Sequence, residues 1–357
     1  MSSASSTRIV IAAGGTAGHV APALAVASEL RSRGADVQFI GGDRAEATLV
    51  PAAGFPLHRL RVEGISRGNL LRALTAIARA AAATLHARRM LRRLRPAAVL
   101  GGGGYVAGPV GLAAVSLRIP LVLSEGDSHL GLANRMLAHA ARRVCLSFPI
   151  AGRDAPRYRV TGRPIPFSGG DRGAARERFG VPPQADCVLV FGGSLGARSI
   201  NEAALAAFAE SPFHVLHVSG ARDYAELSAG PRRPGYDLRD YLDLEDFASA
   251  LSAADLVVAR AGSSVLEIAA HGLPAVLVPY PHATAGHQLQ NARFMEAAGA
   301  ARVIVDGELS PSRLARDVAM VLGDRARMEA MASAARRVAH PRAAAEVAAE
   351  LLEAARG

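Results

Sequence analysis

Short apolar or β-branched runs alternate with longer Ala- and Leu-rich segments along nearly all of the 357 residues. The short runs have strand length and predict strands at residues 8–12, 37–40, 99–100, 121–123, 144–146, 187–191, 214–218, 256–258 and 275–278. The long segments predict helices at residues 21–33, 70–95, 132–141, 200–209, 264–271 and 288–298. Because strands alternate with helices, we predict an α/β fold whose parallel sheets are covered on both faces.

The alternation is interrupted between residues 149 and 180, where Pro, Gly and Arg are frequent. A new strand, glycine loop and helix begin at Cys187, so we place a linker near residues 163–170. We therefore predict two Rossmann-like domains, residues 1–163 and residues 164–341, which also agrees with the chain length. Such sheets bind ligands at the carboxyl ends of their strands, and we expect the two sheets to face an interdomain cleft.

Three glycine-rich loops each join a predicted strand to a helix, at residues 14–19 (GGTAGH), 101–109 (GGGGYVAGP) and 192–198 (GGSLGAR). Glycine lets a backbone approach a ligand closely, and the N-terminus of the following helix attracts an anion. Three such loops favour an anionic ligand over three ordinary tight turns. A nicotinamide cofactor agrees less well, because the first loop lacks the G-x-G-x-x-G order. The chain has no lysine, so it has no P-loop.

A fourth loop, RAGSSVLE at residues 260–267, again joins a predicted strand to a helix. Ser263 and Ser264 are placed to cap this helix and to leave backbone N–H groups for a phosphate. Glu267 lies one turn into the helix, where its carboxylate can accept hydrogen bonds from two ribose hydroxyls. The alternative is a carboxylate that only stabilises the helix N-terminus. The polar stretch after the next strand, which includes Gln288, is either a sugar-contact loop or ordinary surface.

The formal net charge of +10 is unevenly distributed. Residues 1–163 hold 22 arginines and 8 acids, a net of +14, whereas residues 164–357 hold 19 arginines and 23 acids, a net of −4. Nine arginines and no acid lie between Gly64 and Ser124. A basic chain raises the hypothesis of nucleic-acid binding. This segment has no aromatic residue from Gly64 to Tyr105 on which bases would stack, so we expect no nucleic-acid partner.

Other features exclude further classes of protein. Two cysteines, Cys145 and Cys187, make neither a disulfide framework nor a metal-ligand spacing, which indicates a reducing compartment. The first seven residues are too short and uncharged for a signal peptide. The longest uncharged stretch, residues 96–117, contains six glycines and two prolines, so we expect no membrane span there.

The four loops GGTAGH, GGGGYVAGP, GGSLGARSIN and RAGSSVLEIAAHGLP, in this order and at these intervals, resemble the MurG family of peptidoglycan glycosyltransferases. The resemblance covers nearly the whole chain and implies the GT-B fold, with the acceptor on the first domain and UDP-GlcNAc mostly on the second. It implies that the last helix, within residues 342–357, packs back on the first domain. The implied reaction is inverting transfer of GlcNAc from UDP-GlcNAc to the MurNAc 4-hydroxyl of undecaprenyl-diphosphoryl-MurNAc-pentapeptide (lipid I), which gives lipid II.

The resemblance also implies roles for single residues, position by position. Thr16, Ala17 and Gly18 of the first loop would contact the donor sugar, and Tyr105 of the second loop would contact substrate. Ser194 matches a phosphate-contacting serine, and a backbone group at Leu244 would bind the uracil. Glu267 matches a ribose-binding acid, and Gln288 matches a glutamine that holds sugar hydroxyls.

Two stretches depart from the family pattern. The family commonly reads Glu-Gln-Asn where this chain has Glu125-Gly126-Asp127, so Asp127 stands in the place of a donor-contacting asparagine. The usual Gly-Asn-Pro-Val-Arg is replaced by a segment in which Arg163 precedes Pro164, and Arg163 is the candidate substitute for the phosphate-side arginine.

Inverting transfer needs a base for the acceptor hydroxyl and stabilisation of the departing diphosphate. His19 matches a histidine of the family's active site and is a base or proton relay, the alternative being a histidine that only bonds the loop backbone. Glu125 is a second candidate base. We expect the diphosphate to rest on N–H groups near Ser194 and Ser263–Ser264. No Asp-x-Asp occurs, so we predict catalysis with neither metal nor cofactor.

The arginine-rich segment, residues 70–95, predicts an amphipathic helix on an anionic membrane surface. Apolar side chains expected in the lipid interface are Leu70, Leu71, Leu74, Ile77, Leu85, Met90, Leu91 and Leu94. The alternative is an ordinary amphipathic surface helix. Together with the resemblance, this places the chain on the cytoplasmic side of the cell membrane, as a peripheral protein, with cell-wall synthesis or division proteins as partners. Three other functions stay open: a lipid-glucosylating GT-B transferase, a UDP-sugar epimerase and an RNA-binding protein.

Overall fold

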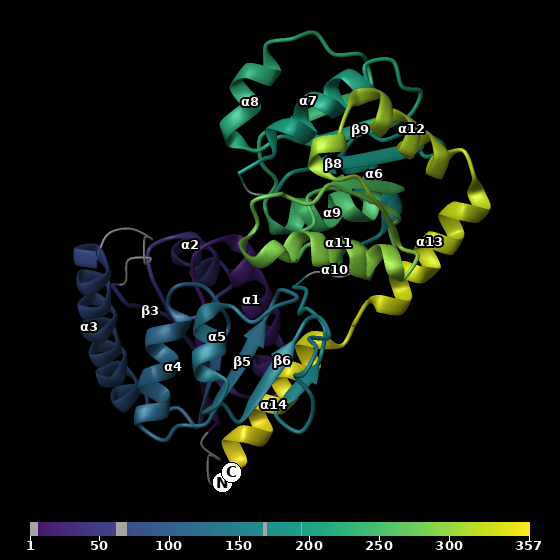
Figure 1. Ribbon diagram of the computed structural model, residues 1–357. Helices are drawn as coiled ribbons and strands as arrows, with labels where there is room; N and C mark the ends of the chain where they lie inside the picture. Colours follow the sequence, from purple (N-terminus) through teal and green to yellow (C-terminus); the bar gives the residue numbers. More distant parts are fainter. Residues whose placement is uncertain (1–5, 62–69, 167–169, 194) are drawn as a thin grey trace. The chain divides into compact units, whose positions relative to one another are not determined.

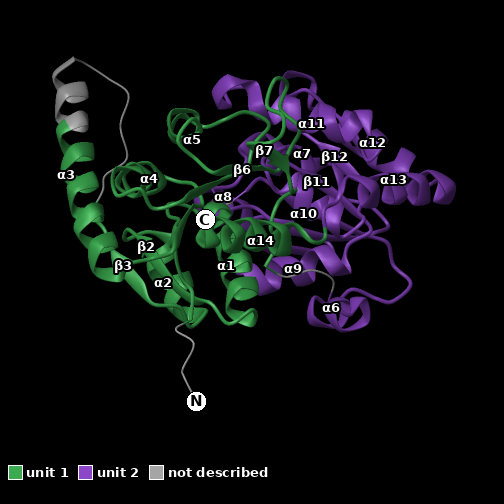
Figure 2. Cartoon of the chain, turned by 90° about the horizontal axis from the view of Figure 1, so that it is seen from below, with its two compact units in different colours: residues 1–166, 341–357 green, residues 167–340 purple. Residues whose placement is uncertain are grey.

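The computed structural model describes residues 6–61, 70–166, 170–193 and 195–357, with the side chains of residues 70–77 outside that description (Figure 1). The described chain divides into two compact units (Figure 2). Unit 1 comprises Met1–Pro166 and Pro341–Gly357, and unit 2 comprises Phe167–His340. Within the described ranges, no helix is both long and apolar enough to span a bilayer.

Unit 1 is built on a seven-stranded parallel sheet in the order β3-β2-β1-β4-β5-β6-β7. Its strands are β1 (Arg8–Ala12), β2 (Asp36–Gly41), β3 (Leu57–Arg59), β4 (Ala98–Gly101), β5 (Leu121–Glu125), β6 (Arg143–Leu146) and β7 (Tyr158–Val160). Its helices are α1 (Ala17–Ser32), α2 (Ala45–Ala52), α3 (Leu70–Leu94), α4 (Ala107–Ser116), α5 (Leu132–Leu137) and α14 (Ala343–Arg356).

Unit 2 contains a six-stranded parallel sheet in the order β10-β9-β8-β11-β12-β13. Its strands are β8 (Cys187–Phe191), β9 (His214–Val218), β10 (Tyr236–Arg239), β11 (Leu256–Ala259), β12 (Ala275–Leu277) and β13 (Ala301–Val303). Its helices are α6 (Arg172–Arg178), α7 (Arg198–Ala207), α8 (Ala221–Ser228), α9 (Leu244–Ala253), α10 (Val265–Ala270), α11 (His287–Ala297), α12 (Pro311–Leu322) and α13 (Arg325–Val338), with short 3-10 turns at Thr284–Gly286 and Asp306–Glu308.

The two-domain, parallel-sheet fold class predicted from the sequence is confirmed. All nine predicted strands are present, within one to two residues of their expected ends. The four strands that the sequence analysis missed, β3, β7, β10 and β13, are the outer strands of the two sheets. Each has only three or four residues, and part of each is solvent-accessible, so none forms a long apolar run.

Helix α3 lies at one side of unit 1 (Figure 2), and Arg88, Arg89, Arg92 and Arg93 occupy its last two turns. The prediction that its apolar side chains all face lipid is wrong in part. Leu91 is completely buried, and Met90 and Leu94 pack against the same core, because they follow the helix face that contacts α4. Leu85 is 56% exposed. The remaining predicted positions, Leu70, Leu71, Leu74 and Ile77, lie outside the described side chains.

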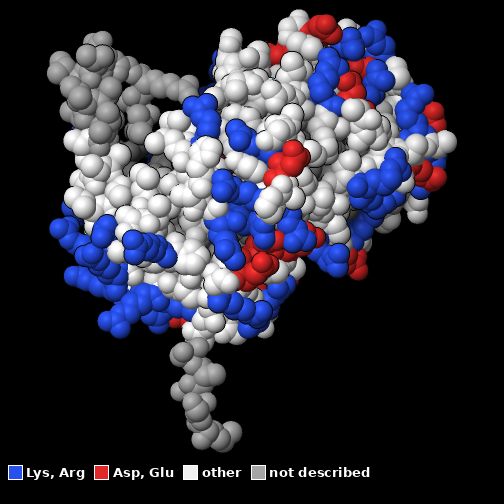
Figure 3. Space-filling view, turned by 60° about the horizontal axis from the view of Figure 1, so that its bottom comes forward, with Lys and Arg blue, Asp and Glu red and all other residues white. Residues whose placement is uncertain are grey.

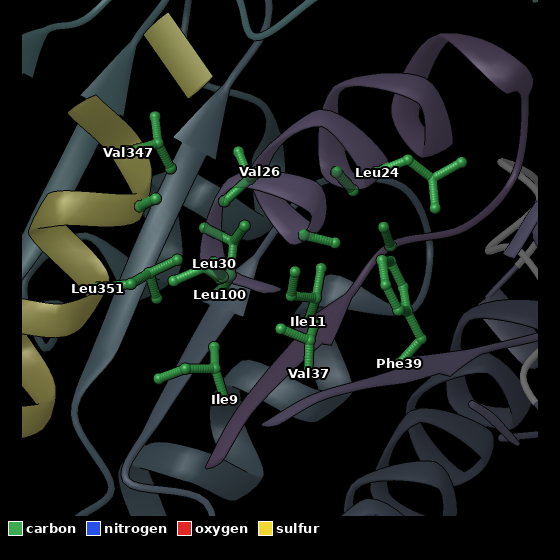
Figure 4. Close-up of a cluster of buried hydrophobic side chains, with 14 of the residues drawn as sticks. Ile9, Ile11, Leu24, Val26, Leu30, Val37, Phe39, Leu100, Val347 and Leu351 are labelled. Carbon is green, nitrogen blue, oxygen red and sulfur yellow. The ribbon is translucent and has the colours of Figure 1, made fainter. Parts of the chain in front are cut away.

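Alternate residues of the central strands of unit 1 enter two different cores, one on each face of the sheet. Ile9 and Ile11 of β1 pack with α1 and α14 (Figure 4). Val10 packs on the other face, with α3, α4 and α5. Val347 and Leu351 of α14 are fully buried in the first of these cores. The carboxyl-terminal helix is therefore an integral part of unit 1.

A buried ion-pair cluster fixes α14 to the far strands of the sheet. Glu350 is only 3% exposed, and its two oxygens accept hydrogen bonds from Arg143 Nε of β6 and Arg159 Nη1 of β7, both at 2.6 Å. This carboxylate gives α14 a fixed register on β6 and β7.

Candidate functional site

Each sheet contains one point where the strand order reverses direction, and that is where parallel α/β sheets bind ligands. In unit 1 the point lies between β1 and β4, which end at the first and second glycine loops. In unit 2 it lies between β8 and β11, which end at the third glycine loop and at the 260–264 turn. The four loops singled out in the sequence therefore fall, two by two, at the expected binding edges.

The first two glycine loops pack directly against each other. A Cβ on Gly104, whose φ is +76°, would lie 1.7 Å from the carbonyl oxygen of Gly14. A Cβ on Gly103, whose φ is +100°, would lie 2.8 Å from Cδ2 of His19. Both positions have positive φ, which favours glycine. A side chain on Gly104 would force the two loops apart, and one on Gly103 would displace the His19 ring. These glycines therefore serve loop packing, whereas the sequence analysis assigned them to the approach of a ligand.

Helix α1 begins at Ala17, four residues before the predicted start, so His19 belongs to its first turn. Thr16 occupies the N-cap position without a side-chain capping bond, and its hydroxyl lies 3.3 Å from Nδ1 of His19. Ala17 and Gly18 thus present the first backbone groups of a 16-residue helix at the binding edge. An anion is favoured at such a helix start.

Arg163 and Asp127 are both near His19. The buried Arg163 donates from Nη2 to the carbonyl oxygen of Gly18, at 3.0 Å. The pKa of His19 lies below its ordinary value, first because surrounding protein desolvates the imidazole and second because Arg163 opposes a positive charge there. Asp127 and Glu46 act in the opposite direction. Because the pKa lies below 6.5, the imidazole is neutral near pH 7, and part of the residue still contacts solvent.

Glu125 is buried, and both of its oxygens accept hydrogen bonds from its own loop. Oε1 accepts from the Asp127 N–H at 3.2 Å, and Oε2 accepts from the Gly131 N–H at 2.8 Å and from Asn134 Nδ2 at 2.9 Å. Burial raises the pKa of Glu125 above its ordinary value. With these bonds in place, the carboxylate organises the β5–α5 loop.

Glu46 is a residue to which the sequence analysis gave no role. It is fully buried, and it accepts hydrogen bonds from the Gly15 N–H at 2.8 Å, the Gly42 N–H at 2.9 Å and the Tyr105 hydroxyl at 2.7 Å. Tyr105 therefore contacts Glu46 through its hydroxyl, and its pKa is raised to about 12, mainly by burial. The signal in the sequence is an acid in the first turn of a helix that begins three residues after the Gly41-Gly42 pair.

In unit 2, the 260–264 turn leads into α10 by a tight first turn. The N–H groups of Val265, Leu266 and Glu267 donate to Gly262, Ser263 and Ser264 carbonyls, respectively, at 3.2, 3.3 and 2.9 Å. Ser264 is the N-cap residue, but its hydroxyl makes no capping bond, so that part of the prediction is wrong. Glu267 is half-buried at the same edge.

Arg260 fixes this turn to its neighbours. Its guanidinium pairs with Asp306 and donates to the Ser199 hydroxyl at 2.9 Å, and Ser199 in turn donates to Asp306 at 2.9 Å. Because Ser199 lies in the first turn of α7, the network joins the turn after β11 to the helix that follows the third glycine loop. The two binding loops of unit 2 are thereby held in one arrangement.

Gln288 lies in the first turn of α11, and its side-chain oxygen accepts from the Tyr280 N–H at 2.9 Å. This bond closes the loop between β12 and α11 and leaves the side-chain NH₂ of Gln288 to donate. Leu244 is the first residue of α9, next to the N-cap Asp243, whose side chain accepts from the Asp246 N–H. Ser194, the predicted phosphate contact, lies outside the described residues.

A buried polar chain beneath the third glycine loop was also missed in the sequence. His217 accepts a hydrogen bond at Nδ1 from the Tyr236 hydroxyl (2.9 Å) and lies 3.1 Å from Asn201 Oδ1 through Nε2. Asn201 Nδ2 donates to the Ser219 carbonyl oxygen at 3.0 Å. A Cβ on Gly196 would lie 2.0 Å from that same oxygen, so the chain supports the backbone on which the loop rests.

Among the described residues, no group of three or more His, Cys, Asp or Glu side chains is arranged to hold a metal ion. Two Rossmann-like units, each with glycine loops at the point where its strand order reverses, define the GT-B class of glycosyltransferases. The N-terminal domain of glycosyltransferase family 28 matches residues 9–146, and the C-terminal domain of that family matches residues 187–347.

Known proteins resemble the chain over nearly its whole length. The UDP-N-acetylglucosamine–N-acetylmuramyl-(pentapeptide) pyrophosphoryl-undecaprenol N-acetylglucosamine transferase of Moorella thermoacetica is 41% identical over 353 residues, covering 94% of this chain and 95% of that protein. The crystal structure of Acinetobacter baumannii MurG superposes with a TM-score of 0.75 at 32% identity, covering 98% and 99% of the two chains. The calicheamicin glycosyltransferase CalG4, at 20% identity and a TM-score of 0.70, shares the fold. The chain belongs to the MurG family within glycosyltransferase family 28.

Proposed function

We propose that this protein transfers GlcNAc from UDP-GlcNAc to the MurNAc 4-hydroxyl of lipid I and so produces lipid II. The observation that carries the proposal is 41% identity, over 94% of this chain, to a transferase named for that reaction. The four glycine or serine loops give the proposal a physical basis, since they lie where the strand order of each sheet reverses, which is where parallel sheets bind ligands.

We place the nucleotide on unit 2. Glu267 accepts the ribose hydroxyls, the 263–264 backbone and the loop of Ser194 bind the diphosphate, and a backbone group at Leu244 reads the uracil. Gln288 donates its NH₂ to a sugar hydroxyl, because its carbonyl oxygen is already occupied by the Tyr280 N–H. Supporting this placement, a Cβ on Gly193 or on Gly262 would meet no protein atom within 4 Å, so a ligand has room to approach there.

We place proton transfer on unit 1. A neutral, exposed His19 accepts the proton of the attacking hydroxyl, directly or as a relay, while the charge of Arg163 beside it favours the departing anionic product. Thr16, Ala17 and Gly18 contact the donor sugar, and Asp127 is a further contact in the loop that Glu125 organises. Tyr105 supports these contacts from the second loop.

The decisive experiment supplies the purified chain with labelled UDP-GlcNAc and a lipid I analogue. We expect label in a disaccharide–diphospholipid product. Glu267→Ala should raise the KM for UDP-GlcNAc at least about tenfold, because a single hydrogen bond to a charged group is worth roughly 1.5–3 kcal/mol. His19→Ala should chiefly lower kcat. The exposed Glu329→Ala is the matched control and should change neither. Label on diacylglycerol, or conversion of UDP-GlcNAc to its epimer, would refute the proposal.

We further propose that unit 1 binds the cytoplasmic face of the cell membrane, where a lipid-linked acceptor resides. The basic end of α3 carries Arg88, Arg89, Arg92, Arg93 and Arg95, all exposed or half-exposed, on a surface where Figure 3 shows few acidic neighbours. Exposed apolar side chains lie on α3 itself, on α4 beside it and on α5, which packs against α4; they are Leu85, Leu112, Leu132 and Met136. Arginines with interspersed apolar side chains are typical of binding to anionic lipid.

Vesicle co-sedimentation tests the membrane proposal. The triple variant Arg88→Glu, Arg89→Glu, Arg92→Glu should bind anionic vesicles at least a hundredfold more weakly, since each arginine contributes about 1 kcal/mol. Reversal of the exposed Arg325 in unit 2 should leave binding unchanged. Binding that is equal on zwitterionic and anionic vesicles would overturn the proposal.

A further inference from the structure

Glu46 is a buried carboxylate that no cation neutralises within the described chain. Its side chain is 0% exposed, and it accepts hydrogen bonds from two backbone N–H groups and one tyrosine hydroxyl. Burial of an unpaired charge costs several kcal/mol unless hydrogen bonds replace the lost water. Despite its burial, which acts to raise it, the pKa of Glu46 lies below its ordinary value, because the Tyr105 hydroxyl and the backbone donors stabilise the ionised form.

The three donors come from three separate segments of unit 1. Gly15 belongs to the loop after β1, Gly42 follows β2, and Tyr105 follows β4. The backbone reinforces the first bond, because the Ala45 N–H donates back to the Gly15 carbonyl oxygen at 3.3 Å. The first turn of α2 therefore binds both polar groups of Gly15, and one carboxylate joins three loops at the binding edge.

His19 is held between two of these loops. Thr16, the residue after Gly15, places its hydroxyl 3.3 Å from His19 Nδ1, and Gly103 of the second loop closely approaches the other side of the imidazole. The charged groups that act on His19 are Arg163, which opposes its protonation, and Asp127 and Glu46, which favour it. Glu46 thus influences His19 in two ways, through the position of the loops and through its negative charge.

We propose that Glu46 is a positioning residue of the transfer reaction: it fixes the loops that carry Thr16 and His19, and its charge supports proton uptake by the imidazole. The proposal rests on the proposed function, in which His19 accepts the proton of the acceptor hydroxyl. Glu46 itself touches no substrate, because it is buried beneath the loops.

The variant Glu46→Gln preserves size and shape but replaces one acceptor oxygen by a donor NH₂. Either the Gly15 N–H or the Gly42 and Tyr105 donors then face another donor. We expect kcat to fall at least tenfold, with the KM for UDP-GlcNAc changed less than threefold, because the proposed nucleotide site is on unit 2. In the full chain, NMR titration of the His19 imidazole, assigned with His19→Ala, should give a lower midpoint, because removal of a nearby negative charge disfavours the protonated form.

Two further variants distinguish the effect of loop position from the effect of the Glu46 charge, and distinguish both from a general loss of stability. Tyr105→Phe removes one donor but retains the carboxylate, so kcat should fall less than in Glu46→Gln and the His19 midpoint should stay near that of the wild type. Glu350→Gln alters another buried, hydrogen-bonded carboxylate, on α14, and should lower the Tm while leaving kcat and the His19 midpoint unchanged.

If Glu46→Gln behaves like Glu350→Gln, with a lower Tm but an unchanged kcat at a permissive temperature and an unchanged His19 midpoint, Glu46 only stabilises the fold and the proposal is wrong. If the wild type transfers no GlcNAc to lipid I, the proposed function fails. The NMR midpoint then still tests the link between Glu46 and His19, because it needs no substrate.

Discussion

Acidification should destabilise unit 2, in part through the buried His217. His217 is completely buried between Tyr236 and Asn201, and burial lowers its pKa from 6.5 to about 4. Asn201 uses its Nδ2 as a donor to Ser219 and Asp223, so its Oδ1 must accept, and Nε2 of His217 therefore carries the proton. Nδ1 then accepts from Tyr236, and the neutral imidazole has both nitrogens satisfied.

The magnitude follows from linkage between protonation and folding. The unfolded chain binds a proton at this histidine near pH 6.5, whereas the folded chain resists it until about pH 4. Because the folded-state pKa is the lower one, the contribution of His217 to the free energy of unfolding is fully present above pH 6.5 and is lost as the pH falls toward 4. At about 1.36 kcal/mol per pH unit, the loss is roughly 2 kcal/mol at pH 5 and about 3 kcal/mol at pH 4.

The assay is urea unfolding of the wild type and of His217→Gln at pH 7, 6, 5 and 4. Glutamine can donate to Asn201 and accept from Tyr236 but does not titrate. We expect the wild type to lose about 3 kcal/mol relative to the variant between pH 7 and pH 4, because the other histidines act equally in both proteins. Parallel loss of stability in the two proteins would show that His217 is not the responsible group.

Three further results are expected. Leu351→Ala, which empties a fully buried position between α14 and the sheet of unit 1, should lower the free energy of unfolding by about 2–5 kcal/mol in denaturant titration, and a loss below 1 kcal/mol would contradict the packing described for α14. Gly262→Ala should leave the Tm unchanged, since its Cβ meets no protein atom within 4 Å, but should raise the KM for UDP-GlcNAc; an unchanged KM would place the ligand elsewhere. Transfer activity should persist in EDTA, because backbone N–H groups are proposed to hold the diphosphate, and a loss restored by Mg²⁺ would contradict this.

The sequence was sufficient for the central part of the fold because each buried strand is a distinct apolar run. The nine predicted strands are those that have sheet neighbours on both sides. The outer strands could not be found in this way, since β3 reads Leu-His-Arg and β7 reads Tyr-Arg-Val, with side chains partly in water. Their pairing depends on neighbours distant in sequence, which local patterns do not record.

The candidate site was predictable as a set of loops but not as a set of bonds. The glycine and serine patterns located all four loops. No local pattern indicates that Glu46 joins Gly15, which lies 31 residues before it, to Tyr105, which lies 59 residues after it. The same holds for Glu125, whose isolation in a stretch poor in acids suggested a base. Its partner Asn134 lies nine residues later in the sequence, in α5, and comes within hydrogen-bond distance only when the loop between β5 and α5 has folded.

The glycines themselves divide into two physical classes that the sequence cannot distinguish. Gly104 and Gly196 have positive φ and would drive a Cβ to 2.0 Å or less from a carbonyl oxygen of a neighbouring segment, so the fold alone requires them. Gly193 also has a positive φ, but a Cβ there meets only open space, and Gly262 combines open space with an ordinary φ. No contact within the described chain requires glycine at residue 262. Because the open space beside Gly262 lies where the strand order of unit 2 reverses, a ligand can approach the backbone there, and this supports the placement of the donor at the turn after β11.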